Sequence, residues 1–175
     1  FDNLSTDEII ILPNNKNIIL AAQATVALTH KHVVVVPTNN VPQGLSAILR
    51  LTPDGEFDDV VSEMTDALSD VEAVEITTAT RSVEMNGVQV EEGQVIGLLD
   101  GKLVAASSDL EETLLGVLRQ ANTVNKERIT FLYGNNVRKD EVDRIANVVQ
   151  SVYPDLEIEV HEGGQPFYHF ILSIE

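Results

Sequence analysis

The chain has 175 residues, of which 43% are hydrophobic, and it carries a formal net charge of −17 at pH 7. This length suffices for a sizeable core in one domain or two small lobes, and the negative charge disfavours binding to nucleic acid or to an anionic membrane surface. The absence of cysteine excludes disulfides and thiolate catalysis. With no signal peptide and no membrane-length apolar run, we expect a cytoplasmic setting. Because the first residue is Phe1, we expect a fragment of a longer protein.

The first third of the sequence has the pattern of a βαβ unit. Residues 8–12 (EIIIL) and 32–36 (HVVVV) predict two strands, and residues 15–30 between them predict a helix. Strands that are apolar throughout are typical of a parallel sheet covered on both faces. A second helix is predicted to carry Pro42 in its first turn, and a third helix is predicted over residues 58–70.

The next part of the sequence is rich in hairpin signals. Asn86-Gly87 and Asp100-Gly101 stand between apolar segments, where such pairs favour tight turns between antiparallel strands. Asp109 is predicted to cap the helix that follows, with Glu112 completing a capping box.

The last part of the sequence predicts a strand, a helix and two half-buried strands. These segments are residues 128–134, 139–153, 156–163 and 167–175. Together the patterns predict an α/β chain with two lobes, a parallel βαβ lobe over residues 1–70 and a mixed-sheet lobe over residues 71–175.

Two strand ends carry the same unusual corner of proline followed by asparagines. The first is "LPNN", with Asn14 and Asn15, and the second is "VPTNN", with Asn39 and Asn40. Proline stops a strand, and asparagine tolerates left-handed backbone angles and caps helices, which gives a purely structural explanation. Alternatively, because ligands of α/β sheets bind at the carboxyl ends of strands, these amides, with Gln43, line a ligand cleft.

Three other features are candidates for binding. Arg81 stands alone at a strand end, where it either pairs with a carboxylate or contacts an anion or a partner. The turn Gly163-Gly164-Gln165 either connects two strands or faces the same cleft. Eight acids and no base lie between Glu56 and Glu75, which indicates a solvated helix face or a docking face for a basic partner formed by Asp58, Asp59 and Glu63.

The residues give little support for catalysis or metal binding. No G-x-x-x-x-G-K-[ST] or G-x-S-x-G motif occurs. His30 and His32 have a spacing that suits a metal, but no nearby cysteine or carboxylate completes a ligand set. We therefore expect no catalytic residue, no metal site and no cofactor in this chain.

Four segments together resemble the carboxy-terminal domain of the A subunit of bacterial fatty-acid kinase. They are "IILPNNKNIILAAQ", "VVVVPTNNVPQGLSAIL", "ITTATRSVEMNGVQVEEGQVIGLLDGKLV" and "EIEVHEGGQPFYHFILSIE". The resemblance covers essentially the whole chain. It implies a two-lobed fold similar to the DegV family and a relationship to dihydroxyacetone kinases.

The resemblance also implies what the longer protein does. A separate amino-terminal domain would bind ATP and Mg, and a middle domain would link it to this one. The complex would phosphorylate a fatty acid carried by a B subunit to an acyl phosphate, for use in phospholipid synthesis. The chain itself would recognise that B subunit. A small-molecule or fatty-acid binding domain that uses the asparagine corners is the alternative, and a free-standing enzyme is the third hypothesis.

Overall fold

The computed structural model describes residues 1–175, and internal contacts divide them into two compact units. Unit 1 is Phe1–Val71 and unit 2 is Glu72–Glu175. None of the helices has the length and apolar content needed to cross a membrane.

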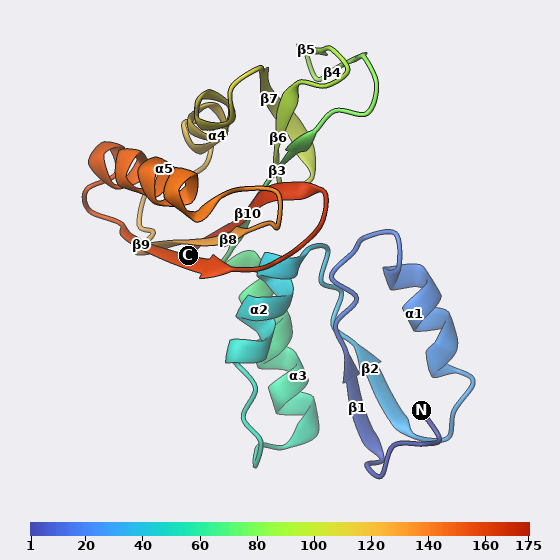
Figure 1. The fold of residues 1–175 in the computed structure, drawn as a ribbon. Coiled ribbons are helices and arrows are strands. Elements are labelled where there is room, and N and C mark those ends of the chain that lie inside the picture. Colours follow the sequence, from blue (N-terminus) through green and yellow to red (C-terminus); the bar gives the residue numbers. More distant parts are fainter. The chain divides into compact units, whose positions relative to one another are not determined.

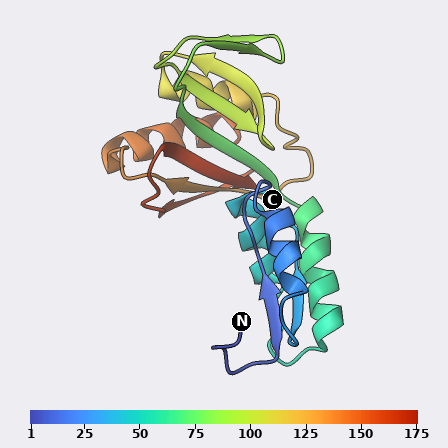
Figure 2. The ribbon, with the colours of Figure 1, turned by 90° about the vertical axis from the view of Figure 1, so that its right-hand side faces the viewer.

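Unit 1 is a βαβ unit followed by a helical pair. Its elements are β1 (Glu8–Ile11), α1 (Ile19–Val26), β2 (His32–Val35), α2 (Val41–Leu49), α3 (Phe57–Asp66) and a short 3-10 helix, η1 (Ala67–Ser69). The strands pair in parallel, with Ile9 opposite Val33. In Figures 1 and 2, α1 lies on one side of the strand pair, next to β2, and α2 and α3 lie on the other.

The core of unit 1 lies between the strands and the helical pair. Val36, Ala47, Val60 and Met64 are buried there. The opposite layer is thinner, because α1 buries no residue completely. Ile18, which lies within the predicted helix over residues 15–30, precedes α1 and is 48% exposed. The prediction of a sheet covered on both faces is therefore only partly met, since every residue of β1 stays at least partly exposed.

Unit 2 is a six-stranded mixed sheet with two helices and a small hairpin. Its elements are β3 (Glu72–Thr78), β4 (Val83–Met85), β5 (Val88–Val90), β6 (Val95–Leu99), β7 (Lys102–Ser107), α4 (Leu110–Leu118), β8 (Arg128–Tyr133), α5 (Lys139–Val152), β9 (Glu157–Glu162) and β10 (Tyr168–Ile174). The strand order is β7-β6-β3-β10-β8-β9, and only the β8–β9 pair is parallel.

Both faces of the sheet in unit 2 carry apolar clusters. On one face α4 and α5 cover the main core, in which Phe131 and Phe170 meet edge to face with ring centroids 5.7 Å apart. On the other face the β4–β5 hairpin packs on Leu103 and forms a smaller cluster with Val90. The predicted turns at Asn86-Gly87 and Asp100-Gly101 are present, and all four residues have positive φ.

The α/β fold with a parallel and a mixed sheet is confirmed, with differences at helix ends. Asp109 caps α4, since its Oδ1 accepts from the Glu112 N–H at 2.8 Å. The capping-box prediction is wrong, because the Asp109 N–H donates to Ser107 Oγ and not to Glu112. Val152, the last residue of α5, is 51% exposed and does not join the core.

Candidate functional site

The two asparagine corners lie side by side in unit 1. The Asn14 N–H donates to Thr38 Oγ1 at 2.8 Å, and the Thr38 side chain is fully buried. Asn14 adopts a left-handed backbone with φ 54°, which asparagine tolerates better than most residues. Its side chain lies against Gly44 of α2, where a Cβ atom would lie 2.0 Å from Asn14 Oδ1. The parallel register of β1 and β2 thus brings both corners to one place.

Several polar atoms of the corners form local hydrogen bonds. Asn40 caps α2 by accepting from the Gln43 N–H at 2.9 Å. Gln43 Oε1 in turn accepts from the Asn39 N–H at 2.7 Å, and Asn15 Oδ1 accepts from the Asn17 N–H. This agrees with the structural explanation for the asparagines.

One side-chain atom of the corners is both buried and unpaired. Asn14 Oδ1 is shielded from solvent and has no hydrogen-bond partner. Buried polar atoms are usually paired, so this oxygen is the feature of the corners that still points to a ligand. A ligand role for the corners stays a prediction.

The glycine turn of the predicted cleft belongs to unit 2, so the cleft as a whole also stays a prediction. Gly163 and Gly164 both donate their N–H groups to the Tyr133 carbonyl, at 3.0 and 3.1 Å. Gly164 has φ 65°, and a side chain at Gly163 would collide with Gln165. Gln165 Nε2 donates to the Leu132 carbonyl at 2.8 Å. These bonds fasten the turn to the end of β8, which supports its role as a strand connection.

A polar cluster around His169 was not predicted as a site. Asn136 Nδ2 lies 2.9 Å from His169 Nδ1, and Thr78 Oγ1 lies 2.9 Å from His169 Nε2. With the Asn136 amide donating to Nδ1, a neutral ring carries its proton on Nε2 and donates to the Thr78 hydroxyl. The Thr78 hydroxyl then accepts from the ring, and its own hydrogen is free to be donated elsewhere. This arrangement orients a hydroxyl and does not activate it as a nucleophile.

Burial lowers the pKa of His169, and nearby Glu141 raises it by a smaller amount. The unfolded chain, with a histidine pKa of about 6.5, therefore binds the proton more readily than the folded chain. Stability contributed by the neutral ring is present above the unfolded pKa and is lost as the pH falls below it. We expect the stability of unit 2 to fall between about pH 7.5 and pH 5.5, and to fall less in His169→Gln.

Tyrosine fluorescence during urea unfolding measures this, because all three tyrosines (Tyr133, Tyr153, Tyr168) lie in unit 2. The control is His30→Gln, which removes an imidazole from unit 1. An identical pH dependence in His169→Gln and the parent would contradict this assignment.

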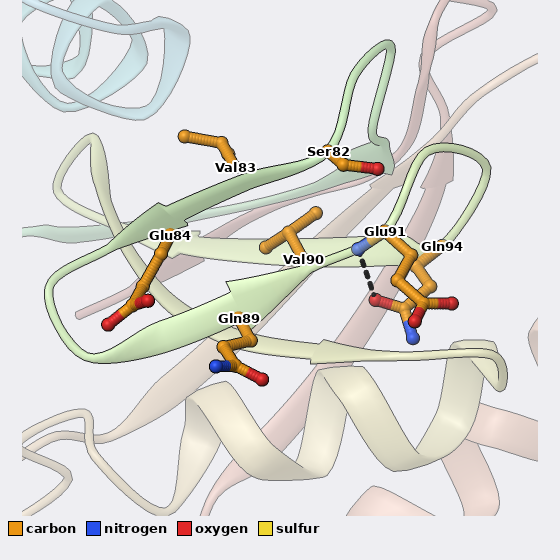
Figure 3. A pocket seen from close by; sticks show the side chains of 7 residues that line it. All are labelled: Ser82, Val83, Glu84, Gln89, Val90, Glu91 and Gln94. Carbon is orange, nitrogen blue, oxygen red and sulfur yellow. Dashed lines mark hydrogen bonds between the residues drawn. The ribbon is translucent and has the colours of Figure 1, made fainter.

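A surface pocket of about 540 Å³ lies on the β4–β5 hairpin. Figure 3 shows its lining, including the cross-strand pair Glu84 and Gln89 and the bond from the Glu91 N–H to Gln94 Oε1. Two glutamates in the lining disfavour an anionic ligand. None of the residues predicted to form the cleft lines this pocket.

The remaining candidates are all at the surface. Arg81 is exposed at the start of the hairpin segment and takes part in no ion pair. Of its two predicted roles, pairing with a carboxylate is therefore not seen, and contact with an anion or a partner stays a prediction. Asp58, Asp59 and Glu63 are exposed on α3. Asp58 lies 3.9 Å from His32, whose ring contacts the Phe57 ring at a tilt of 51°. Nowhere do three histidine or acidic side chains come together as metal ligands.

One known protein family matches the chain over almost its whole length. The family of C-terminal domains like that of the A subunit of fatty acid kinase matches residues 2–175. The chain belongs to this family. The resemblance inferred from the four sequence segments is thereby confirmed.

The curated relatives are longer proteins. An uncharacterized protein of Staphylococcus haemolyticus is 36% identical over 166 residues, which cover 95% of this chain and 30% of the relative. An uncharacterized protein of Staphylococcus aureus (strain USA300) is 34% identical over the same shares. The chain therefore spans about a third of the length of the curated relatives it matches.

Solved structures confirm the DegV-like fold. The Streptococcus pneumoniae fatty acid kinase B3 protein, solved with linoleic acid, superposes with a TM-score of 0.66 at 11% identity, covering 98% of this chain and 72% of that chain. A DegV family protein from Corynebacterium glutamicum gives a TM-score of 0.66 at 13% identity, covering 96% and 75%. At these identities the likeness concerns the fold alone.

The sequence analysis missed the His169 cluster because its members lie far apart in the chain. Thr78, Asn136 and His169 follow or belong to three different strands. The order of β3, β10 and β8 in the sheet brings them together. No motif within a short segment of the sequence indicates that these three residues meet.

Proposed function

We propose that this chain is the partner-recognition domain of a fatty-acid kinase A subunit. It docks the B subunit that carries the fatty acid, so that the carboxylate reaches an ATP and Mg site on a separate domain. Its contribution to the rate is positioning, which converts an encounter of two proteins into a reaction within one complex. The acyl phosphate formed would enter phospholipid synthesis, and the proposed setting is the cytoplasm.

The observation that carries this proposal is the family match over residues 2–175 of a chain that has no phosphate-binding loop. A chain of a kinase family that lacks the glycine-rich loop and lysine of ATP sites has another task than phosphoryl transfer. The fold supports the same conclusion, because it resembles a fatty acid kinase B protein. In this proposal a carrier-like fold is reused for recognition.

The outer face of α2 supplies an apolar surface for docking. Its small residues Pro42, Gly44, Ser46 and Ala47 face inward and are buried. Its large residues face solvent; Val41, Leu45, Ile48 and Leu49 are 36%, 42%, 51% and 73% exposed. A helix with its large apolar side chains outside is unusual for a surface that meets only water. Val41, Leu45, Ile48 and Leu49 form what we call the α2 stripe.

Acidic residues on the adjacent helix supply the charge. α3 packs beside α2 and exposes Asp58, Asp59 and Glu63. Interfaces between separate proteins combine an apolar centre with a polar rim, and charged rims steer the approach of a partner of opposite sign. The α2 stripe and the acids of α3 therefore fit a partner with basic residues around an apolar patch.

Charge reversal on α3 tests the electrostatic part of the proposal. We expect Asp58→Lys, Asp59→Lys and Glu63→Lys together to weaken B-subunit binding about tenfold at low salt and to flatten its salt dependence. Calorimetric titration at two salt concentrations, with a complete A subunit, measures both. Asp2→Lys with Asp7→Lys is a control, since both acids are exposed in unit 1 but lie outside α3. If the α3 variant keeps the affinity of the parent and the same dependence of affinity on salt, these acids only form a solvent-exposed face and do not contribute to docking.

A second candidate function is ligand binding at the asparagine corners. The buried and unpaired Asn14 Oδ1 favours it, because a donor group of a small molecule would satisfy that oxygen. Native mass spectrometry of the purified protein tests this. A co-purified lipid or small molecule that is lost in Asn14→Gly would support a ligand site, and a strictly ligand-free protein would argue for docking alone.

A further inference from the structure

The turn between β9 and β10 carries an aromatic side chain into solvent. Phe167 is 80% exposed, whereas Phe131 and Phe170 are completely buried. A single exposed apolar side chain is common on protein surfaces, so exposure alone assigns it no role. The backbone that holds Phe167 in this position is what sets it apart.

The backbone at Phe167 has a conformation that phenylalanine rarely adopts. Its φ is 71°, and the Tyr168 N–H donates to the Pro166 carbonyl at 2.9 Å, which closes a three-residue turn around it. Such a turn with positive φ at its centre is rare and strained. Every other residue of the chain with positive φ is glycine, asparagine or aspartate, which tolerate this region better. The fold therefore loses stability by keeping phenylalanine at this position.

Hydrogen bonds from neighbouring segments hold the turn in this shape. Thr77 Oγ1, on β3, donates to the Phe167 carbonyl at 2.7 Å. The Gly134 N–H, just after β8, donates to the His169 carbonyl at 2.9 Å. Strained backbone persists only where its surroundings fix it, and such positions are concentrated at binding sites. Phe167 is thus presented on a rigid support, which lowers the entropic cost of binding.

The segments that meet at this turn carry no aspartate, glutamate, lysine or arginine. Residues 163–169 and 134–137 contain none of these, although they make up 22% of the whole chain. On β3, Thr77 and Thr78 bond to the same turn through their hydroxyls. Centres of protein–protein interfaces are depleted in charged residues and enriched in aromatic ones, and the residues around an anchor exclude water. The composition around Phe167 is that of an interface centre.

A pocket on a separate protein fits these observations better than other contacts of Phe167. A membrane surface is disfavoured because the turn has no basic residue and the chain has a net charge of −17, which also opposes pairing with a second copy. Domains joined in one polypeptide are already concentrated near one another by their linker, so a strained anchor contributes most where two separate molecules associate. The B subunit of the proposed function is such a separate protein.

We propose that Phe167 is an aromatic anchor of this chain for the B subunit. The ring inserts into an apolar pocket of that protein, and its uncharged surroundings form the border that excludes water. This inference rests on the proposed function and adds a contact on unit 2 to the α2 stripe of unit 1. The role explains the strained turn, because the turn keeps the ring where a partner reaches it.

The variant Phe167→Asn separates binding from folding. Asparagine tolerates left-handed backbone angles, so the midpoint of urea unfolding of unit 2, followed by tyrosine fluorescence, should stay the same or rise. Binding of a complete A subunit to a fatty-acid-loaded B subunit should weaken about 30-fold in a calorimetric titration. The control is Val124→Asn, which removes another exposed apolar side chain of unit 2 and should bind like the parent.

The outcomes distinguish this inference from the function on which it rests. A parent A subunit that does not bind the B subunit would refute the proposed function, and this inference with it. A parent that binds, with Phe167→Asn binding equally tightly, would overturn only the role of Phe167. A lower unfolding midpoint in Phe167→Asn would overturn that role as well, since it would show that the ring stabilises unit 2.

A photoreactive phenylalanine derivative at position 167 identifies the protein that receives the ring. In a complete A subunit mixed with the fatty-acid-loaded B subunit, the expected product is a crosslink between the two proteins. A crosslink within one A subunit, or between two copies of it, would assign Phe167 to another contact and overturn the proposal.

Discussion

Replacing Leu45 and Leu49 by glutamine is expected to weaken binding of a fatty-acid-loaded B subunit by about 100-fold, or about 3 kcal/mol. Both side chains belong to the α2 stripe, and they are 42% and 73% exposed. Apolar residues at the centre of an interface contribute most of the binding free energy, and glutamine removes that contribution without adding charge. Because glutamine is a good helix former, α2 itself should persist.

The control replaces two exposed leucines in and next to α1 of unit 1. Leu20 and Leu28 are 78% and 82% exposed, so Leu20→Gln with Leu28→Gln changes the same chemistry outside α2. The control should bind the B subunit like the parent. Equal affinity of the α2 variant and the control, measured by calorimetry on a complete A subunit, would remove α2 from the docking surface.

Gly44→Ala is expected to destabilise unit 1 by about 1–3 kcal/mol, although alanine normally stabilises a helix relative to glycine. The added Cβ would lie 2.0 Å from Asn14 Oδ1 and 2.6 Å from Asn14 Cγ, so the asparagine must leave its place. Its displacement would disturb the corner where the Asn14 N–H meets Thr38. The corner at Asn14 and helix α2 are therefore packed tightly against each other.

A double-mutant cycle separates this contact from other effects. Asn14→Gly keeps the left-handed backbone at that position and removes the side chain that blocks residue 44. In that background Gly44→Ala should become neutral or stabilising by up to about 1 kcal/mol. The free energy of unfolding is followed through amide signals of unit 1. The same cost in both backgrounds would show that the contact with Asn14 is not the cause.

The sequence predicted the presence of helices and strands better than the residues at which they begin and end. Strong local signals placed β2, the turn at Asn86-Gly87 and the cap at Asp109, because each depends on a few neighbouring residues. Helix α1 is shorter than predicted, and Ile18 just before it and Leu20 in its first turn are exposed, so neither holds the start of the helix against a core. The spacing of apolar residues along the sequence indicates which face of a helix is apolar, but it does not indicate whether another surface packs against that face.

The candidate site, like the fold, could be predicted only in part from the sequence. Proline and asparagine after each strand predicted two neighbouring corners, because parallel strands end at the same edge, and the Asn14–Thr38 hydrogen bond joins them. The outward orientation of the α2 stripe could not be predicted from the sequence. Helix α2 is apolar on most sides, so its sequence does not indicate which side is buried, and only the structure shows that the small residues face inward.

The most direct test of the central claim is a calorimetric titration, at two salt concentrations, of this chain with a lipid-loaded B subunit. The docking function predicts binding at both concentrations, with affinity that falls as salt rises because the acids of α3 contribute. No binding at either concentration, under conditions in which a complete A subunit does bind, would contradict the claim that these residues recognise the B subunit.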